Sequence, residues 1–91
     1  MTSSKAWSLY MIRCKGGVLY TGITTDVQRR FKEHKSGKGA KFLRGKSPLT
    51  LVYQQQVGNH SDTLKAEIKI KKLSKFEKEA LILAGESPSQ S

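Results

Sequence analysis

The first 34 residues of the sequence carry four side chains of the types that phosphoryl-transfer chemistry uses. Cutting a phosphodiester bond requires an activated water or hydroxyl, a proton acceptor, stabilisation of transition-state charge and help for the leaving alkoxide. Tyr10, Tyr20 and His34 are candidates for the proton-transfer roles, and Arg30 is the candidate for contact with phosphate. A site of this kind would bring a tyrosine or histidine base, an arginine and an acidic metal ligand into one basic groove.

Tyr10 and Tyr20 lie on two apolar segments that predict the arms of a β-hairpin. Tyr20 is followed by Thr21 and Gly22, and a glycine at the end of a strand lets a neighbouring group or a substrate approach closely. Most tyrosines in strands are packing residues, so a structural role for either one is the competing interpretation.

Arg30 belongs to a stripe at helical spacing, together with Val27, Phe31 and His34, that should face the sheet. An arginine facing inward needs an anionic partner or a polar cleft. The competing interpretation is that Arg29 and Arg30 both reach solvent. His34, one turn further on, could contact phosphate, transfer a proton or cap the end of the helix.

The segment that follows this helix, residues 35–46, reads KSGKGAKFLRGK and holds three glycines and five basic residues. This composition predicts a loop, with one helical turn at Ala40 to Leu43. Its basic residues are candidates for phosphate contact, and Phe42 could stack on a base. The basic candidates are Lys35, Lys38, Lys41, Arg44 and Lys46, with Arg29 on the preceding helix. We favour nucleic-acid binding over a merely solvated run of charge.

Charge points to the same class of partner. The chain has 91 residues, with 17 Lys and Arg against seven Asp and Glu, which gives a formal net charge of +10. Such a surplus favours a polyanionic partner, and nucleic acid is the leading candidate. The alternative is that lysine simply keeps a small domain soluble. No segment combines a strong basic face with a broad apolar one, so we expect no membrane partner.

Cysteine content and the lack of apolar runs indicate a reducing compartment. Cys14 is the single cysteine, so an internal disulfide and a cysteine-based zinc cluster are excluded. Residues 1–6 show no apolar leader, and no run approaches the roughly 18 apolar residues of a membrane span. We therefore expect a cytoplasmic protein.

Hydrophobic patterns predict the elements that position these residues. The apolar segments 7–14 and 18–23 flank a glycine turn and predict the hairpin. Thr24, Thr25 and Asp26 offer capping side chains for a helix over about 26–36. A third strand is expected over 49–57, where apolar residues alternate after Pro48.

Two helices are predicted in the last third. Apolar residues alternate with Lys and Glu over 61–73, which is typical of a strand, but the composition and the Ser61-Asp62 start favour a helix. The segment 74–77, Ser-Lys-Phe-Glu, is a capping box and begins the last helix. We expect its buried face to consist of Phe76, Ala80, Leu83 and Ala84, with Gly85 closing it.

The order of elements, ββαβαα, predicts an α+β fold in which helices flank a three-stranded, mostly antiparallel sheet. A chain of this length has room for one domain with a small core, so the active site should be a surface groove. We expect this domain to span residues 7–84, with flexible termini at 1–6 and 85–91.

The spacing of the candidate residues resembles the GIY-YIG nuclease family. A tyrosine lies ten residues before Tyr20-Thr21-Gly22, an arginine lies ten residues after Tyr20, and a histidine follows four further on. The segment YTGITTDVQRRFKEH is similar to that family's strand-loop-helix signature. The segments GKGAKF, SPLTLVY and AEIKIKKLSKFEKEALI extend the resemblance, which covers about residues 7–82.

The resemblance extends to the nuclease halves of excision-repair and homing endonucleases, and is stronger to small stand-alone bacterial members related to the structure-specific Slx1-type nucleases. It implies that Tyr10 and Tyr20 activate the nucleophile and that Arg30 stabilises transition-state charge, with His34 in the same catalytic group. It also implies that Glu67 binds a single divalent metal, Mg²⁺ or Mn²⁺. From the residues alone, Glu67 reads as helix-surface charge balance among lysines.

Two departures from the family pattern concern the name-giving tripeptides. Residues 8–10 read Ser-Leu-Tyr in place of Gly-Ile-Tyr, and Thr21 replaces the isoleucine of the second motif, whereas both tyrosines and Gly22 are retained. The asparagine that some larger members use near the domain end has no counterpart after Asn59.

The resemblance implies a metal-dependent endonuclease acting on DNA, favoured over RNA, by structure and not by sequence. The alternative function is a non-cleaving or partner-dependent nucleic-acid-binding module, because the chain carries no separate targeting domain and a protein partner could supply targeting. DNA repair, recombination and mobile-element control all stay open as the process served.

Overall fold

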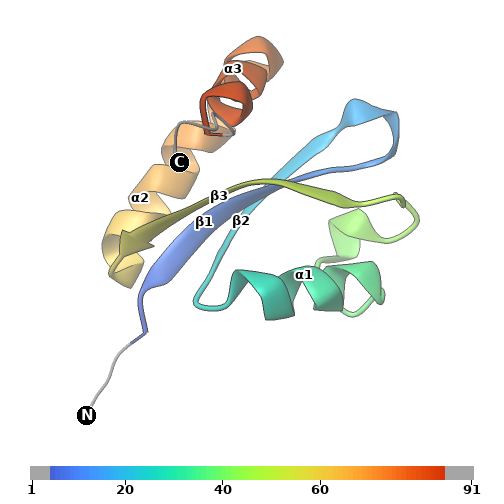
Figure 1. Ribbon diagram of the computed structural model, residues 1–91, viewed down its shortest axis with the longest axis horizontal. Coiled ribbons are helices and arrows are strands. Elements are labelled where there is room, and N and C mark those ends of the chain that lie inside the picture. The colour runs from blue at the N-terminus through green and yellow to red at the C-terminus, as the bar shows by residue number, and fades with distance from the viewer. Residues whose placement is uncertain (1–4, 86–91) are drawn as a thin grey trace.

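A three-stranded antiparallel sheet forms the centre of the molecule, in the order β2-β1-β3. The structure is a computed structural model that describes residues 5–85. Strand β1 (Trp7–Arg13) pairs with β2 (Leu19–Thr24) through the predicted hairpin, and β3 (Thr50–Gly58) pairs with the other edge of β1. The predicted α+β class and the order ββαβαα are confirmed (Figure 1).

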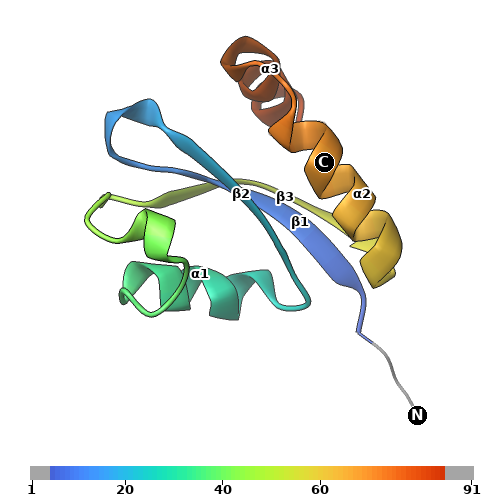
Figure 2. The ribbon, with the colours of Figure 1, turned by 180° about the vertical axis from the view of Figure 1, so that it is seen from behind.

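Strand β1 is the central strand because its apolar residues are continuous. Residues 9–12, Leu-Tyr-Met-Ile, are each at most 1% exposed. A strand reads this way when both faces of its sheet are covered. Helix α1 lies on one side of the sheet, and α2 and α3 lie on the other, in both views (Figures 1 and 2). The side chains of Tyr10 and Ile12 join the core on the α1 side, with Val27 and Leu43.

Helix α1 (Val27–Lys35) begins at its cap, Asp26, whose side chain accepts a hydrogen bond from the backbone N–H of Arg29. Such a cap stabilises a helix by about 1 kcal/mol relative to alanine. The predicted inward stripe is confirmed: Val27 and His34 are buried, and Arg30 is half-buried. The one helical turn expected at Ala40 to Leu43 is present as a 3₁₀ turn at Lys41–Leu43.

Helix α2 (His60–Lys71) resolves the strand-or-helix alternative in favour of a helix. Its cap is Asn59, which accepts a hydrogen bond from the backbone N–H of Asp62 at 2.8 Å. The alternation of apolar and charged residues suggested a strand, but the residues that face the sheet recur at helical spacing. That stripe consists of Thr63, Ala66, Glu67 and Ile70.

Helix α3 (Lys75–Gly85) begins with the predicted capping box, in which Ser74 and Glu77 exchange hydrogen bonds. Its predicted buried face is wrong. Phe76 and Leu83 are 82% and 70% exposed, and Ile82 is the buried residue. The face turned toward the sheet carries Ile82, which is buried, and Glu79, which forms an ion pair with Arg13 of β1.

Within residues 5–85, no helix is long and apolar enough to cross a membrane. The flexible termini expected from the sequence fall largely on residues 1–4 and 86–91, which lie outside the described part of the chain.

Candidate active site

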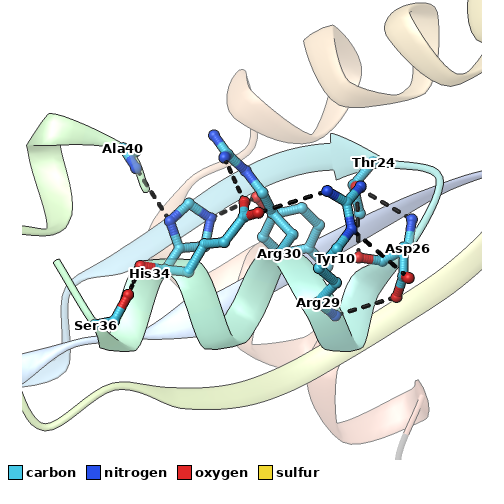
Figure 3. Close-up of polar contacts among 9 residues, drawn as sticks. Tyr10, Thr24, Asp26, Arg29, Arg30, His34, Ser36 and Ala40 are labelled. Carbon is cyan, nitrogen blue, oxygen red and sulfur yellow. Dashed lines mark hydrogen bonds and ion pairs between the residues drawn. The ribbon is translucent and has the colours of Figure 1, made fainter. Parts of the chain in front are cut away.

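Tyr10, His34 and the backbone of Ala40 form one continuous set of hydrogen-bonded groups. The Tyr10 Oη and the His34 Nε2 are 2.8 Å apart, and the backbone N–H of Ala40 donates to the His34 Nδ1 at 3.1 Å (Figure 3). Tyr10 comes from the central strand, His34 from the last turn of α1, and Ala40 from the loop beyond it. Both side chains are at least 97% buried, so the geometry of this set is fixed by packing.

Arg30 lies one turn before His34 on the same helix. Its Nη1 donates to the Glu33 Oε1 at 3.0 Å, and its side chain is 36% exposed. The guanidinium also lies beside the Tyr10 phenol, close enough to act on its ionisation. Arg30 therefore combines an anchoring carboxylate, contact with the candidate tyrosine and partial access to solvent, which suits a group that receives a phosphate.

Burial controls the protonation of both aromatic groups. Burial raises the pKa of Tyr10 to about 12, assisted by Tyr20 and opposed by the Arg30 guanidinium. Burial also lowers the pKa of His34, and the positive charge of Arg30 adds to this effect. At neutral pH the pair is therefore a phenol and a neutral imidazole.

Tyr20 extends this group toward the surface. Its ring packs edge-on against His34, with centroids 5.5 Å apart, and stacks on Phe42 at 5.9 Å and an interplanar angle of 24°. Phe42 is 48% exposed, and the Lys46 Nζ lies 4.6 Å from its ring centroid. An aromatic and basic surface thus begins directly at the second candidate tyrosine.

A surface pocket of about 270 Å³ runs beside this aromatic pair at the edge strand β2. It is lined by residues of the hairpin, the loop after α1 and the two last helices: Leu19, Tyr20, Thr21, Phe42, Lys71 and Lys78. This pocket lies next to Tyr20, between elements far apart in the sequence.

Glu67 is connected to the pocket by its ion-pair partner, Lys71. Its side chain is only 16% exposed and pairs with the Lys71 Nζ at 3.1 Å, and Lys71 lines the pocket. The structure brings Tyr10, Tyr20, Arg30 and His34 into mutual contact. Glu67 is not part of that contact group and lies on α2, which covers the opposite face of the sheet.

Glu67 is the metal ligand that the family resemblance implies, and its carboxylate is paired with Lys71. Among the described residues there is no group of three or more His, Cys, Asp or Glu side chains that could enclose an ion. A single inward carboxylate suits Mg²⁺ or Mn²⁺, hard ions that retain several waters and take further oxygens from substrate phosphates.

The other candidate contacts with nucleic acid lie at the surface. Arg29 is 61% exposed and pairs with Asp26 and Glu33. Lys35 lies over the Phe31 ring at 5.4 Å. The remaining exposed candidates in the loop are Lys38, Lys41 and Arg44. This loop is held in place at its centre by the buried side chain of Leu43 and at its end by a hydrogen bond from Lys15 N–H to the Lys46 carbonyl at 2.8 Å.

Three site residues were missed by sequence reasoning. Glu33 anchors Arg30, and its position three residues further along the helix is the signal that could have found it. Ala40 contributes only its backbone N–H, and Gly39 matters only because a bulkier residue would collide with His34. No side-chain pattern could have indicated these last two.

A family model also matches most of this chain. The family model described as the GIY-YIG catalytic domain matches residues 6–80. The chain therefore belongs to the GIY-YIG family.

The relatives are small proteins of one group. The chain is 58% identical over 80 residues to a UPF0213 protein of Citrobacter koseri, covering 88% of this chain and 80% of the relative. It is 56% identical over 79 residues to the UPF0213 protein YhbQ of Escherichia coli, covering 87% and 79%. The solution structure of a UPF0213 protein from Bacillus halodurans matches with a TM-score of 0.60 at 40% identity, covering 92% and 89% of the two chains.

Proposed function

We propose that this protein is a metal-dependent endonuclease that hydrolyses phosphodiester bonds in DNA and recognises the structure of its substrate, not its sequence. One observation carries the proposal. Tyr10, Tyr20, Arg30 and His34 form a single contact group beside an aromatic and basic surface. Membership of the GIY-YIG family supports the same chemistry.

Each side chain has a proposed role that follows from its position. Tyr10 and Tyr20, whose ring centroids are 6.3 Å apart, would orient the attacking water and accept its proton. Arg30, held by Glu33, would stabilise the negative charge that develops on the phosphoryl oxygens. The basic residues after α1 would hold the flanking phosphates and set the register of the strand.

Glu67 is the residue that would hold the metal, with Lys71 displaced from its carboxylate. A bound Mg²⁺ or Mn²⁺ supplies Lewis-acid stabilisation of a phosphate oxygen and of the leaving group. Residues 63–70 present Glu67 on the inward stripe of α2, so its carboxylate is directed by the fold and not free in solvent.

Cleavage of labelled DNA tests the proposal directly. Purified protein is incubated with Mg²⁺ or Mn²⁺ and with duplex, single-stranded, flap and junction DNA, and matched RNA, and products are separated on a denaturing gel. Wild type should cut at least one substrate. Arg30→Ala and Glu67→Ala should each cut at least about 100-fold more slowly, the range for loss of one transition-state contact.

Lys15→Ala serves as the matched control, because Lys15 is an exposed cation on the β-hairpin turn. It should cut like wild type, and melting temperatures should show that every variant is folded. Wild-type protein that cuts no substrate with either metal would refute the catalytic proposal.

The ion pair between Arg30 and Glu33 favours a second candidate function, a nucleic-acid-binding module that cuts only with a protein partner or not at all. The Glu33 carboxylate at 3.0 Å already offsets part of the positive charge of Arg30, which reduces the charge stabilisation that cleavage requires. Salt-sensitive binding that survives Glu67→Ala, with cutting seen only on addition of a partner, would select this function.

Binding can be assigned to the proposed surface with two phenylalanines. Phe42→Leu should weaken binding of oligonucleotides with unpaired bases by about tenfold, within the range for loss of one stacked base. Phe76→Leu is its control, because Phe76 is 82% exposed on α3 and does not line the pocket beside Tyr20. Equal effects of the two changes would remove Phe42 from the binding surface.

A further inference from the structure

The two ring nitrogens of His34 have partners of different kinds. The Nδ1 lies 3.1 Å from the backbone nitrogen of Ala40, and the Nε2 lies 2.8 Å from the Tyr10 Oη. A backbone N–H can only donate, so the Nδ1 must be an acceptor. In a neutral imidazole the hydrogen is then on Nε2, which must donate to the tyrosine oxygen.

We propose that the backbone N–H of Ala40 holds His34 in its Nε2–H form, so that His34 is a hydrogen-bond donor that positions Tyr10 and is not a proton acceptor. The catalytic meaning of this assignment rests on the proposed nuclease function. The assignment of the hydrogen itself rests only on the geometry of the three residues.

The surroundings of His34 disfavour its charged form as well. An imidazolium would place an Nδ1–H against the Ala40 N–H, two donors facing one another at 3.1 Å. The ring is 3% exposed. The groups around it are Tyr10 from β1, Tyr20 from β2, and Arg30 and Glu33 from α1, and burial with the charge of Arg30 lowers its pKa.

Gly39 is what allows the loop to reach the ring. A Cβ atom at position 39 would lie 2.1 Å from the His34 Nδ1 and 2.9 Å from its Cα. Neither approach is possible without moving the backbone. We therefore assign Gly39 and Ala40 the role of positioning residues that act on Tyr10 through His34.

This arrangement defines what Tyr10 can do. Its oxygen accepts the His34 hydrogen, so its own hydrogen is left to donate to another acceptor. When Tyr10 loses that hydrogen, the bond from His34 becomes charge-assisted and stabilises the phenolate. His34 and Arg30 therefore act together against the burial that disfavours ionisation of Tyr10.

Nitrogen NMR of the full chain reads the state of His34 without any activity. Long-range ¹⁵N–¹H correlations distinguish Nε2–H, Nδ1–H and imidazolium forms. The wild-type ring should be in the Nε2–H form from pH 7 to pH 9. An Nδ1–H form, or an imidazolium at pH 7, would overturn the proposal whether or not the protein cuts DNA.

Two substitutions of His34 distinguish a hydrogen-bond donor from a proton acceptor at this position. In His34→Gln the amide nitrogen can take the place of Nε2 and donate to Tyr10, whereas in His34→Asn the amide reaches only the place of Nδ1. We expect the glutamine variant to cut within about tenfold of wild type and the asparagine variant to lose about 100-fold, the cost of a misplaced group. If His34 were a general base, both substitutions would remove that base and would slow cutting equally.

The same pair of variants has a readout that needs no cleavage. The ionisation of Tyr10, followed through its ¹³Cζ resonance, should begin at higher pH in His34→Asn than in His34→Gln. Identical titration of Tyr10 in the two variants would remove the donor role even if the protein proves to be only a binding module.

Gly39→Ala tests the loop, with Ala40→Gly as its control. The added methyl group should break the Ala40 contact and give a mixture of His34 tautomers, with a lower kcat and a nearly unchanged KM. Ala40→Gly keeps the N–H and should keep the Nε2–H form. An unchanged tautomer in folded Gly39→Ala would show that the loop does not fix the ring.

Discussion

Tyr10 lies directly across the sheet from Gly22, and its ring covers that glycine. The two residues are paired in the antiparallel register of β1 and β2. A Cβ atom at position 22 would lie 2.6 Å from the Tyr10 Oη and 2.7 Å from its Cζ. The Tyr10 ring therefore packs directly on Gly22, in space that a side chain at position 22 would fill.

We predict that Gly22→Ala displaces the Tyr10 ring and lowers the cutting rate by about 100-fold, because a group misplaced by about 1 Å loses that much. Stability should fall by about 1–3 kcal/mol, the cost of overpacking a core. Urea unfolding and single-turnover cleavage measure the two effects. A folded variant with wild-type cutting would show that the position of Tyr10 is not needed.

The cutting rate should rise with pH. Burial raises the pKa of Tyr10 to about 12, so its phenolate fraction increases about tenfold per pH unit below that value. If phenolate accepts the proton of the attacking water, single-turnover rates in Mg²⁺ should increase between pH 7 and pH 9 with a slope near one. Tyr10→Phe should lose both the rate and the slope. A flat profile in the wild type would assign proton transfer to another group.

Lys71 should compete with the metal for Glu67. The two side chains are paired at 3.1 Å, and because the Lys71 side chain is 56% exposed we take the pair to be worth about 0.2–1 kcal/mol. Lys71→Gln should therefore tighten Mn²⁺ binding by about two- to fivefold, measured by electron paramagnetic resonance in the absence of DNA. Lys72→Gln is the control, because Lys72 is an exposed neighbour at the end of α2.

Glu67→Gln should abolish that Mn²⁺ binding. Tight Mn²⁺ binding that persists in Glu67→Gln would place the metal on other residues, and unchanged binding in Lys71→Gln would show that the ion pair does not oppose it.

Acid should weaken the attachment of α3. Hydrogen bonds from Arg13 and Lys75 lower the pKa of Glu79 from 4.5 to about 2. A carboxylate with a depressed pKa stabilises the fold above its unfolded value, and this contribution is lost as pH falls from about 4.5 toward 2. Urea midpoints measured from pH 2 to pH 7 should decline less steeply in Glu79→Gln than in wild type. Parallel curves would exclude this pair as a source of acid sensitivity.

Local sequence determined most of the fold. The glycine turn between two apolar segments specifies the hairpin, Asp26 begins α1, and Ser74 with Glu77 begins α3. The inward stripe of α1 also follows from spacing alone, because helical period places Val27 and His34 on one face. These features depend on interactions within a few residues, which the order of amino acids contains.

Only the tertiary structure decided the rest. The face of α3 that meets the sheet carries the buried Ile82 and Glu79, which pairs with Arg13, 66 residues away, and Phe76 is left exposed. The tautomer that we infer for His34 depends on the backbone N–H of Ala40, in a loop that passes close to the ring because residue 39 is glycine. The half-buried position of Glu67 follows from how α2 meets the sheet. Packing between distant segments sets each of these, and neither periodicity nor composition records it.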